Sequence, residues 1–205
     1  MSHELYVFGS LARGEVSPSS DVDILAIPGA DNRRDFPRTW SVYSKETIES
    51  YFRAGRLFAW HLHLEAVRVY PLQGSSFLTG LGSPNSYTTA RADIIELEAL
   101  LEGALRELRC GTDSVIYELG IGYTAIRDIA MAASWRMLGK PSFSRNAPYL
   151  LPVNCPLPLK SFHTAMLARH ASTRGTAEPQ GLSEAVASFQ HLPLLEWAAS
   201  IRRSV

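Results

Sequence analysis

The sequence has few cysteines and no excess charge of either sign. Its 205 residues include only Cys110 and Cys155, which lie far apart and form no CxxC pair. Two such cysteines provide neither a disulfide framework nor a zinc site, so we expect a reducing, cytoplasmic setting. Lysine plus arginine and aspartate plus glutamate are balanced at 20 each. Because the chain as a whole has no basic field, we do not expect it to bind long nucleic acid.

Long apolar runs are also absent from the sequence. No run approaches the roughly 18 residues that a membrane-spanning helix needs. The first ten residues lack the positive charges and apolar core of a signal peptide. We therefore expect no membrane partner. The composition, 46% hydrophobic and 20% charged, is that of a globular protein of one large or two small domains.

Glycine, proline and serine divide the sequence into two parts with different patterns. Residues 5–8 and 22–27 are short and apolar, as expected for strands, and a third strand is predicted from Thr39. Ser44 is placed to cap the helix that follows. The Gly- and Pro-rich stretch at 70–87 places a boundary near residue 85. We predict an α+β fold, a small mixed sheet with flanking helices in residues 1–85, followed by an all-helical bundle in residues 86–205.

After this boundary, apolar residues recur at helical spacing. The first such stripe comprises Ile94, Leu97, Leu101, Leu105 and Leu108. Asp113 is placed to cap a second helix, and Gly139 is placed to end it. Further helices are predicted around residues 160–171 and from Ser183, with a break at Pro193.

One segment of the first part, residues 57–65, fits two structures. Its apolar residues alternate with polar or small ones, which favours a half-buried strand in which His61, His63 and Glu65 share a face. The segment also fits a helix, in which only His61 and Glu65 lie on one face and Glu65 can pair with Arg68. The sequence alone leaves both structures open.

Residues 7–27, VFGSLARGEVSPSSDVDILAI, are suited to bind phosphate and metal. Asp21 and Asp23 are two residues apart on a predicted strand, so their carboxylates share a face. A divalent cation between them would relieve their repulsion, and Mg²⁺ prefers oxygen ligands of this kind together with substrate phosphates. Gly9 allows close approach of the backbone to a ligand, and Ser10 offers a hydroxyl. The segment therefore predicts a phosphate loop facing a carboxylate pair.

The spacing of these residues resembles the signature of the polymerase-β-like nucleotidyltransferase superfamily. The family pattern is Gly-Ser, two residues, Arg-Gly, about five residues and Ser-Asp-x-Asp, which is matched here by Gly9-Ser10, Arg13-Gly14 and Ser20-Asp21-Val22-Asp23. The resemblance implies transfer of a nucleoside monophosphate from a nucleoside triphosphate, ATP in our expectation, to an acceptor hydroxyl. In plan the chain is similar to the kanamycin nucleotidyltransferases, and it resembles a bacterial group of such proteins with a helical partner domain.

The resemblance also implies roles for individual residues. Two Mg²⁺ ions would be held by Asp21 and Asp23. The nucleotide would be bound by the residues of the loop, which are Gly9, Ser10, Arg13, Gly14 and Ser20. Family members usually supply a third carboxylate from the next strand, where this sequence has Ser41. Glu65 is therefore the candidate for a third catalytic acid, which the strand alternative for residues 57–65 would place suitably.

The acceptor and the wider function stay open at this stage. The acceptor is a small molecule, a protein side chain or an RNA end. One alternative is an antitoxin-like or defence-system interaction protein that modifies or binds a protein partner. Another is a nucleotide sensor without catalysis, which the lack of an acid at Ser41 suggests. The oligomeric state is likewise left open.

Overall fold

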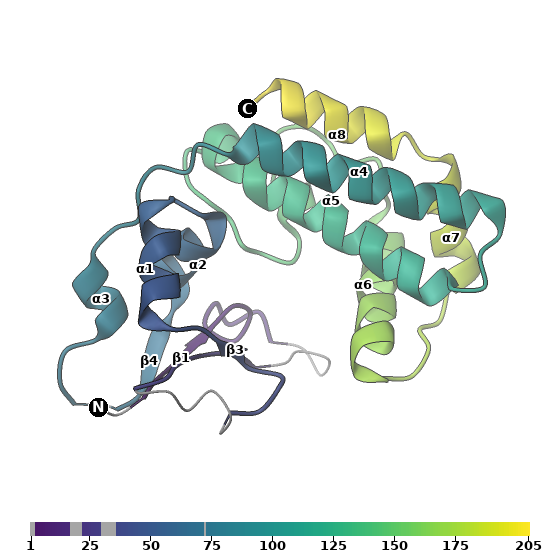
Figure 1. The fold of residues 1–205 in the computed structure, drawn as a ribbon. Helices are drawn as coiled ribbons and strands as arrows, with labels where there is room; N and C mark the ends of the chain where they lie inside the picture. Colours follow the sequence, from purple (N-terminus) through teal and green to yellow (C-terminus); the bar gives the residue numbers. More distant parts are fainter. Residues whose placement is uncertain (1–2, 17–21, 30–35, 72) are drawn as a thin grey trace. The chain divides into compact units, whose positions relative to one another are not determined.

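The computed structural model describes residues 3–16, 22–29, 36–71 and 73–205. The chain divides into two compact units, Met1–Thr88 and Thr89–Val205 (Figure 1). A functional division into residues 1–85 and 86–205 stays a prediction. Within the described ranges, no helix combines the length and the apolar composition needed to cross a membrane.

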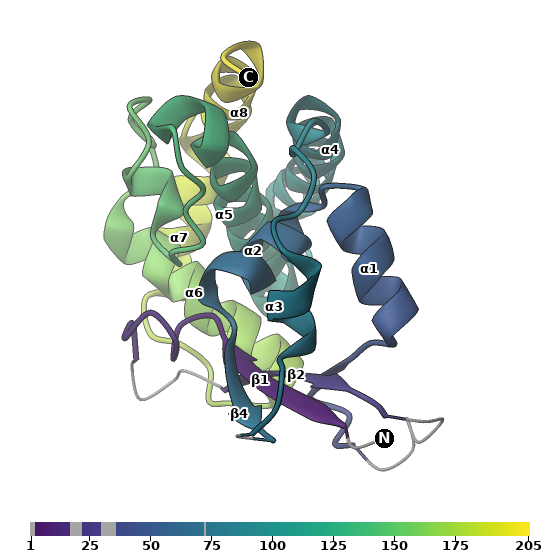
Figure 2. The ribbon, with the colours of Figure 1, turned by 90° about the vertical axis from the view of Figure 1, so that its left-hand side faces the viewer.

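The first unit is built on a four-stranded mixed sheet with the order β3-β2-β1-β4. The strands are β1 (Glu4–Phe8), β2 (Asp23–Ile27), β3 (Ser41–Val42) and β4 (Val67–Tyr70). β1 pairs antiparallel with β2 and β4, and β2 pairs parallel with β3. Figure 2 shows β4, β1 and β2 side by side. The predicted strands and the mixed character of the sheet are therefore confirmed.

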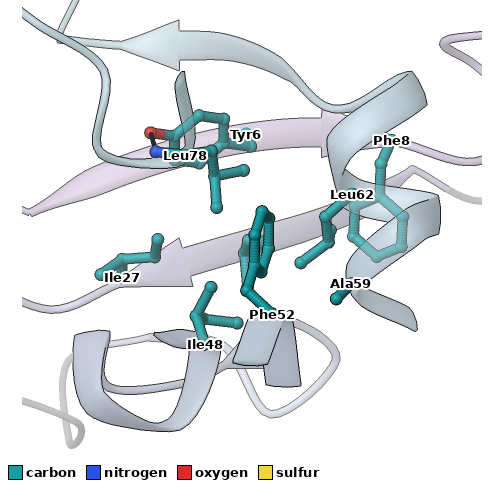
Figure 3. Packing of buried hydrophobic residues seen from close by; sticks show 9 residues of the cluster. Tyr6, Phe8, Ile27, Ile48, Phe52, Ala59, Leu62 and Leu78 are labelled. Atoms are coloured by element: carbon teal, nitrogen blue, oxygen red, sulfur yellow. Dashed lines mark hydrogen bonds between the residues drawn. The ribbon is translucent and has the colours of Figure 1, made fainter. Parts of the chain in front are cut away.

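One face of this sheet forms the core of the first unit. Phe8 lies opposite Asp23 and Tyr6 lies opposite Leu25, and directly paired residues share a face. Three helices pack on this face: α1 (Lys45–Arg53), α2 (Leu57–Glu65) and α3 (Phe77–Leu81). Figure 3 shows their side chains between the strands and the helices. Asp23 therefore belongs to the helix-covered face, at the end of β2 where the chain enters the strand.

The helix α1 begins as the sequence predicts. Ser44 is its N-cap, and the side chain of Ser44 accepts a hydrogen bond from the backbone N–H of Thr47 at 3.2 Å. Ile48 and Phe52, four residues apart, are both buried in the core. The helix thus presents one apolar stripe to the sheet.

Residues 57–65 form the helix α2, so the strand alternative for this segment is wrong. The segment contains no β-branched residue, whereas the next strand, β4, contains Val67 and Val69. Leucine and alanine favour the helix, and β-branched residues favour the strand. Ala59 and Leu62 face the core from α2, which has apolar residues on all sides. Because apolar residues lie on all sides of α2, apolar and polar residues alternate in this sequence although the segment is a helix.

The second unit is a packed group of helices, as predicted. They are α4 (Ala90–Cys110), α5 (Val115–Leu138), the short 3₁₀ helix η2 (Ala147–Tyr149), α6 (Leu159–Arg174), α7 (Leu182–His191) and α8 (Leu194–Arg203). α5 packs against α4, α6, α7 and α8. In the predicted stripe of α4, all members are buried except Leu97, which is partly exposed. The N-cap of α5 is Ser114 and not Asp113, while Gly139 ends α5 in a left-handed conformation as predicted.

Candidate nucleotide-binding site

A tight turn at residues 9–14 follows β1. Gly9 and Gly14 have φ angles of +73° and +72°, which residues other than glycine rarely adopt. The backbone N–H of Arg13 donates to the carbonyl of Gly9 at 3.1 Å, and that of Glu15 donates to the carbonyl of Ser10 at 2.9 Å. Four of the predicted nucleotide-binding residues, Gly9, Ser10, Arg13 and Gly14, therefore lie in one backbone-bonded turn.

The side chain of Asp23 packs directly against this turn. A Cβ atom placed on Gly9 would lie 2.3 Å from Oδ2 of Asp23 and 3.2 Å from its carboxyl carbon. The first distance is far below van der Waals contact. The carboxylate of Asp23 thus occupies space that only a glycine at residue 9 leaves open. The structure brings a predicted metal ligand and the predicted phosphate loop into contact.

Two of the predicted site residues, Ser20 and Asp21, lie outside the described residues. The carboxylate pair and its shared face therefore stay predictions. Within the described part of the chain, no group of three or more His, Cys, Asp or Glu side chains is arranged to hold a metal ion. Asp23 nevertheless offers the hard oxygen donors that Mg²⁺ prefers. The carboxylate at this position therefore fits a divalent cation, and the number of ions stays a prediction.

Glu65, the last residue of α2, contacts the same turn. Nη1 of Arg13 donates to Oε2 of Glu65 at 2.6 Å, and Nε2 of His61 lies 2.9 Å from that same oxygen. The side chains of Arg13, His61 and Glu65 are only 18%, 19% and 13% exposed. These three residues form a partly buried polar cluster that joins the Gly9–Gly14 turn to the C-terminal end of α2.

This arrangement corrects two expectations for Glu65. His61, His63 and Glu65 do not share a face, because on a helix only the residues four apart do so. Nε2 of His63 instead lies 3.3 Å from Oγ of Ser83. The expected pair between Glu65 and Arg68 is not formed, since Nη2 of Arg68 donates to the carbonyl of Gly74 at 2.7 Å. The role of Glu65 as a third catalytic acid stays a prediction, without the strand geometry that suggested it.

Sequence reasoning missed a second carboxylate in this cluster. Oε2 of Glu15 lies 3.2 Å from Nε of Arg13. The guanidinium of Arg13 therefore has a carboxylate on each side, from Glu15 within the turn region and from Glu65 on α2. The Arg-Gly-Glu order of residues 13–15 is the one local signal of this contact.

Aromatic contacts support the cluster from the core. The ring of Phe8, at the end of β1, meets the His61 ring edge to face with centroids 5.3 Å apart. It also meets the ring of Phe58 on α2, at 5.9 Å. Edge-to-face pairs of this kind add to the energy of simple apolar burial. The strand that precedes the turn and the helix that carries Glu65 are therefore packed together at this end of the sheet.

A protein-family model described as the nucleotidyltransferase domain matches residues 2–63 of this chain. The matched range includes β1, the Gly9–Gly14 turn, β2, β3, α1 and most of α2, and it ends two residues before Glu65. A search of curated proteins found no match. The sequence motif, the mixed sheet and the contact between Gly9 and Asp23 are all consistent with this family match. Residues 2–63 of this chain are a nucleotidyltransferase domain of the polymerase-β-like kind.

Proposed function

We propose that this protein is an enzyme that transfers a nucleoside monophosphate from a nucleoside triphosphate, ATP in our proposal, to an acceptor hydroxyl. The observation that carries the proposal is the contact between the Asp23 carboxylate and the Gly9 backbone. It puts an oxygen ligand suited to a cation beside a loop suited to phosphate. Both lie in the range matched by the nucleotidyltransferase model.

The protein contributes mainly binding and positioning in this proposal. Gly9 and Ser10 hold the phosphates through backbone N–H groups and the Ser10 hydroxyl, and Asp23 together with Asp21 holds Mg²⁺. When bound, Mg²⁺ neutralises charge on the phosphates and on the leaving pyrophosphate. The acceptor oxygen forms a bond to the α-phosphorus, the bond to pyrophosphate breaks, and the acceptor proton passes to a general base. Orienting the α-phosphate toward the acceptor is the main catalytic task of the chain.

For the acceptor, we propose a small molecule or a protein side chain before an RNA end. Lysine plus arginine and aspartate plus glutamate number 20 each, so the chain lacks the overall positive charge that favours nucleic acid. A short RNA end needs fewer phosphate contacts and is kept as a third class to screen.

Calorimetric titration with ATP, GTP, CTP and UTP, each with and without Mg²⁺, tests the proposal. We expect one triphosphate to bind with a strong dependence on Mg²⁺. Asp23→Asn should weaken this binding at least about tenfold, because a neutral amide is a poor Mg²⁺ ligand. Glu102→Gln, an exposed position on α4, serves as the matched control and should bind like the unchanged protein. Binding of none of the four, or equal binding by Asp23→Asn, would contradict the proposal.

A nucleotide sensor without catalysis is a second candidate, and one observation favours it. Ser41 begins β3 and pairs with Leu25 of β2, so the strand beside Asp23 carries a hydroxyl where the resemblance leads us to expect an acid. Such a protein binds the triphosphate with Mg²⁺ but releases no pyrophosphate. Product analysis therefore separates the two functions, whereas calorimetry alone does not.

A further inference from the structure

We propose that Glu65 is a positioning residue that holds the Gly9–Gly14 turn, through Arg13, in the conformation that binds the triphosphate. This inference rests on the proposed function for the identity of the ligand. It assigns Arg13 to the anchoring of the turn and Glu65 to the orientation of Arg13. Neither side chain then has to contact substrate.

The contact between Arg13 and Glu65 can act on the turn because Arg13 is also bonded within it. Its side chain donates to Glu65 at 2.6 Å, while its backbone N–H donates to the Gly9 carbonyl at 3.1 Å. Gly9 in turn packs against the Asp23 carboxylate. A short chain of contacts therefore runs from the end of α2 to the predicted metal ligand. Loss of the Glu65 carboxylate would free the side chain of Arg13 and so remove the link between α2 and the turn.

The carboxylate of Glu65 is itself held in place. His61, one helical turn earlier on α2, has Nε2 2.9 Å from the same Oε2 atom that Arg13 contacts. The ring of His61 packs against Phe8, the residue that precedes the turn. The side chain of Glu65 is 13% exposed, so water competes little for its oxygen atoms. Through His61, the cluster is therefore attached to the core at Phe8.

The charges in the cluster favour anchoring over ligand binding. The Arg13 guanidinium lies between two carboxylates, at 2.6 Å from Glu65 and 3.2 Å from Glu15. Its positive charge is therefore already balanced within the protein. A phosphate group would meet a guanidinium whose charge is already shared by two carboxylates, so it would gain less there than at an unpaired arginine. Oε2 of Glu65 is already shared by Arg13 and His61, so a metal ion would compete with them for the charge of this carboxylate.

A double-mutant cycle with Glu65→Gln and Arg13→Gln tests the inference. Each change should weaken binding of the triphosphate selected by calorimetry about 10- to 100-fold, as is typical of residues that orient a ligand site. The double variant should bind the triphosphate as tightly as the single variant with the lower affinity, because both changes break the same contact. Glu184→Gln is the control, since it removes an exposed carboxylate paired with Lys160 on the other unit.

Hydrogen exchange in the nucleotide-free protein provides a readout that does not depend on the reaction. The amides of Arg13 and Glu15, which donate within the turn, should exchange faster in Glu65→Gln and in Arg13→Gln than in the unchanged protein. Thermal melting of each variant shows whether the fold is retained. If the unchanged protein binds no triphosphate, the proposed function fails, and the exchange rates still test the anchoring of the turn.

Two results would overturn the inference. Additive losses of binding in the double variant would show that Arg13 and Glu65 act independently. Unchanged exchange and unchanged binding in Glu65→Gln, with a loss confined to kcat, would make Glu65 a catalytic carboxylate. Faster exchange, weaker binding and non-additivity together support positioning.

Discussion

The carboxylate of Asp23 occupies the space that a side chain at residue 9 would need. A Cβ atom on Gly9 would lie 2.3 Å from Oδ2 of Asp23. Gly9→Ala must therefore displace either the Asp23 carboxylate or the turn. We expect Mg²⁺-dependent binding of the triphosphate to weaken at least about tenfold, since displacements near 1 Å are costly in such sites. Calorimetry on the folded variant measures this loss.

Gly14→Ala is the matched control for this prediction. Gly14 has nearly the same φ angle, +72° against +73° for Gly9, but a Cβ there would meet no atom within 4 Å. Both changes should lower stability by about 1–2 kcal/mol through the left-handed conformation. Gly9→Ala should lose more nucleotide binding than Gly14→Ala, because only the Cβ at residue 9 meets the Asp23 carboxylate. Equal losses of binding would assign the effect to backbone strain rather than to the contact with Asp23.

The two cysteines should differ sharply in reactivity. Cys110 is exposed, whereas burial raises the pKa of the Cys155 thiol to about 11. At pH 8 the reactive thiolate of Cys155 is therefore a fraction of about one in a thousand, and the site is also shielded. We expect a thiol reagent such as Ellman's reagent to modify one cysteine per chain rapidly and the second only after unfolding. Rapid modification of both in the folded protein would contradict the packing around Cys155.

Glycine within α5 is needed for close helix packing. A Cβ on Gly122 would lie 2.5 Å from Cε1 of Phe189, a fully buried ring on α7. Gly122→Ala should therefore destabilise the protein by about 1–3 kcal/mol, although alanine is the better helix former. Gly103→Ala, on α4, meets no atom within 4 Å and should stabilise by up to about 1 kcal/mol. Urea denaturation of both variants checks the sign, and stabilisation by Gly122→Ala would contradict the packing of α7 on α5.

The elements that the sequence predicts correctly have local signals. The helix α1 is recognisable from the Ser44 cap and from Ile48 and Phe52 at helical spacing. The strands β1 and β2 are short apolar runs beside turn residues. The motif between them is also local, and its spacing was enough to indicate the nucleotidyltransferase domain that the family model matches.

The parts that could not be predicted depend on contacts between distant residues or on ambiguous patterns. Arg13 and Glu65 are 52 residues apart, and no local pattern pairs them. The helix alternative correctly put His61 and Glu65 on one face. The shared strand face of His61, His63 and Glu65 was wrong, and so was the choice of the nearby Arg68 as the partner of Glu65. In residues 57–65 apolar side chains surround the helix, so periodicity could not separate helix from strand.

The most direct test of the account is product analysis with triphosphate labelled at the α-phosphate, incubated with Mg²⁺ and a panel of hydroxyl acceptors. We predict that the protein releases unlabelled pyrophosphate while label is transferred to one acceptor, and that Asp23→Asn reduces the rate by at least about a thousandfold because the cation is lost. Glu102→Gln should react at the rate of the unchanged protein. Binding of the triphosphate without pyrophosphate release, or full transfer by Asp23→Asn, would contradict the account.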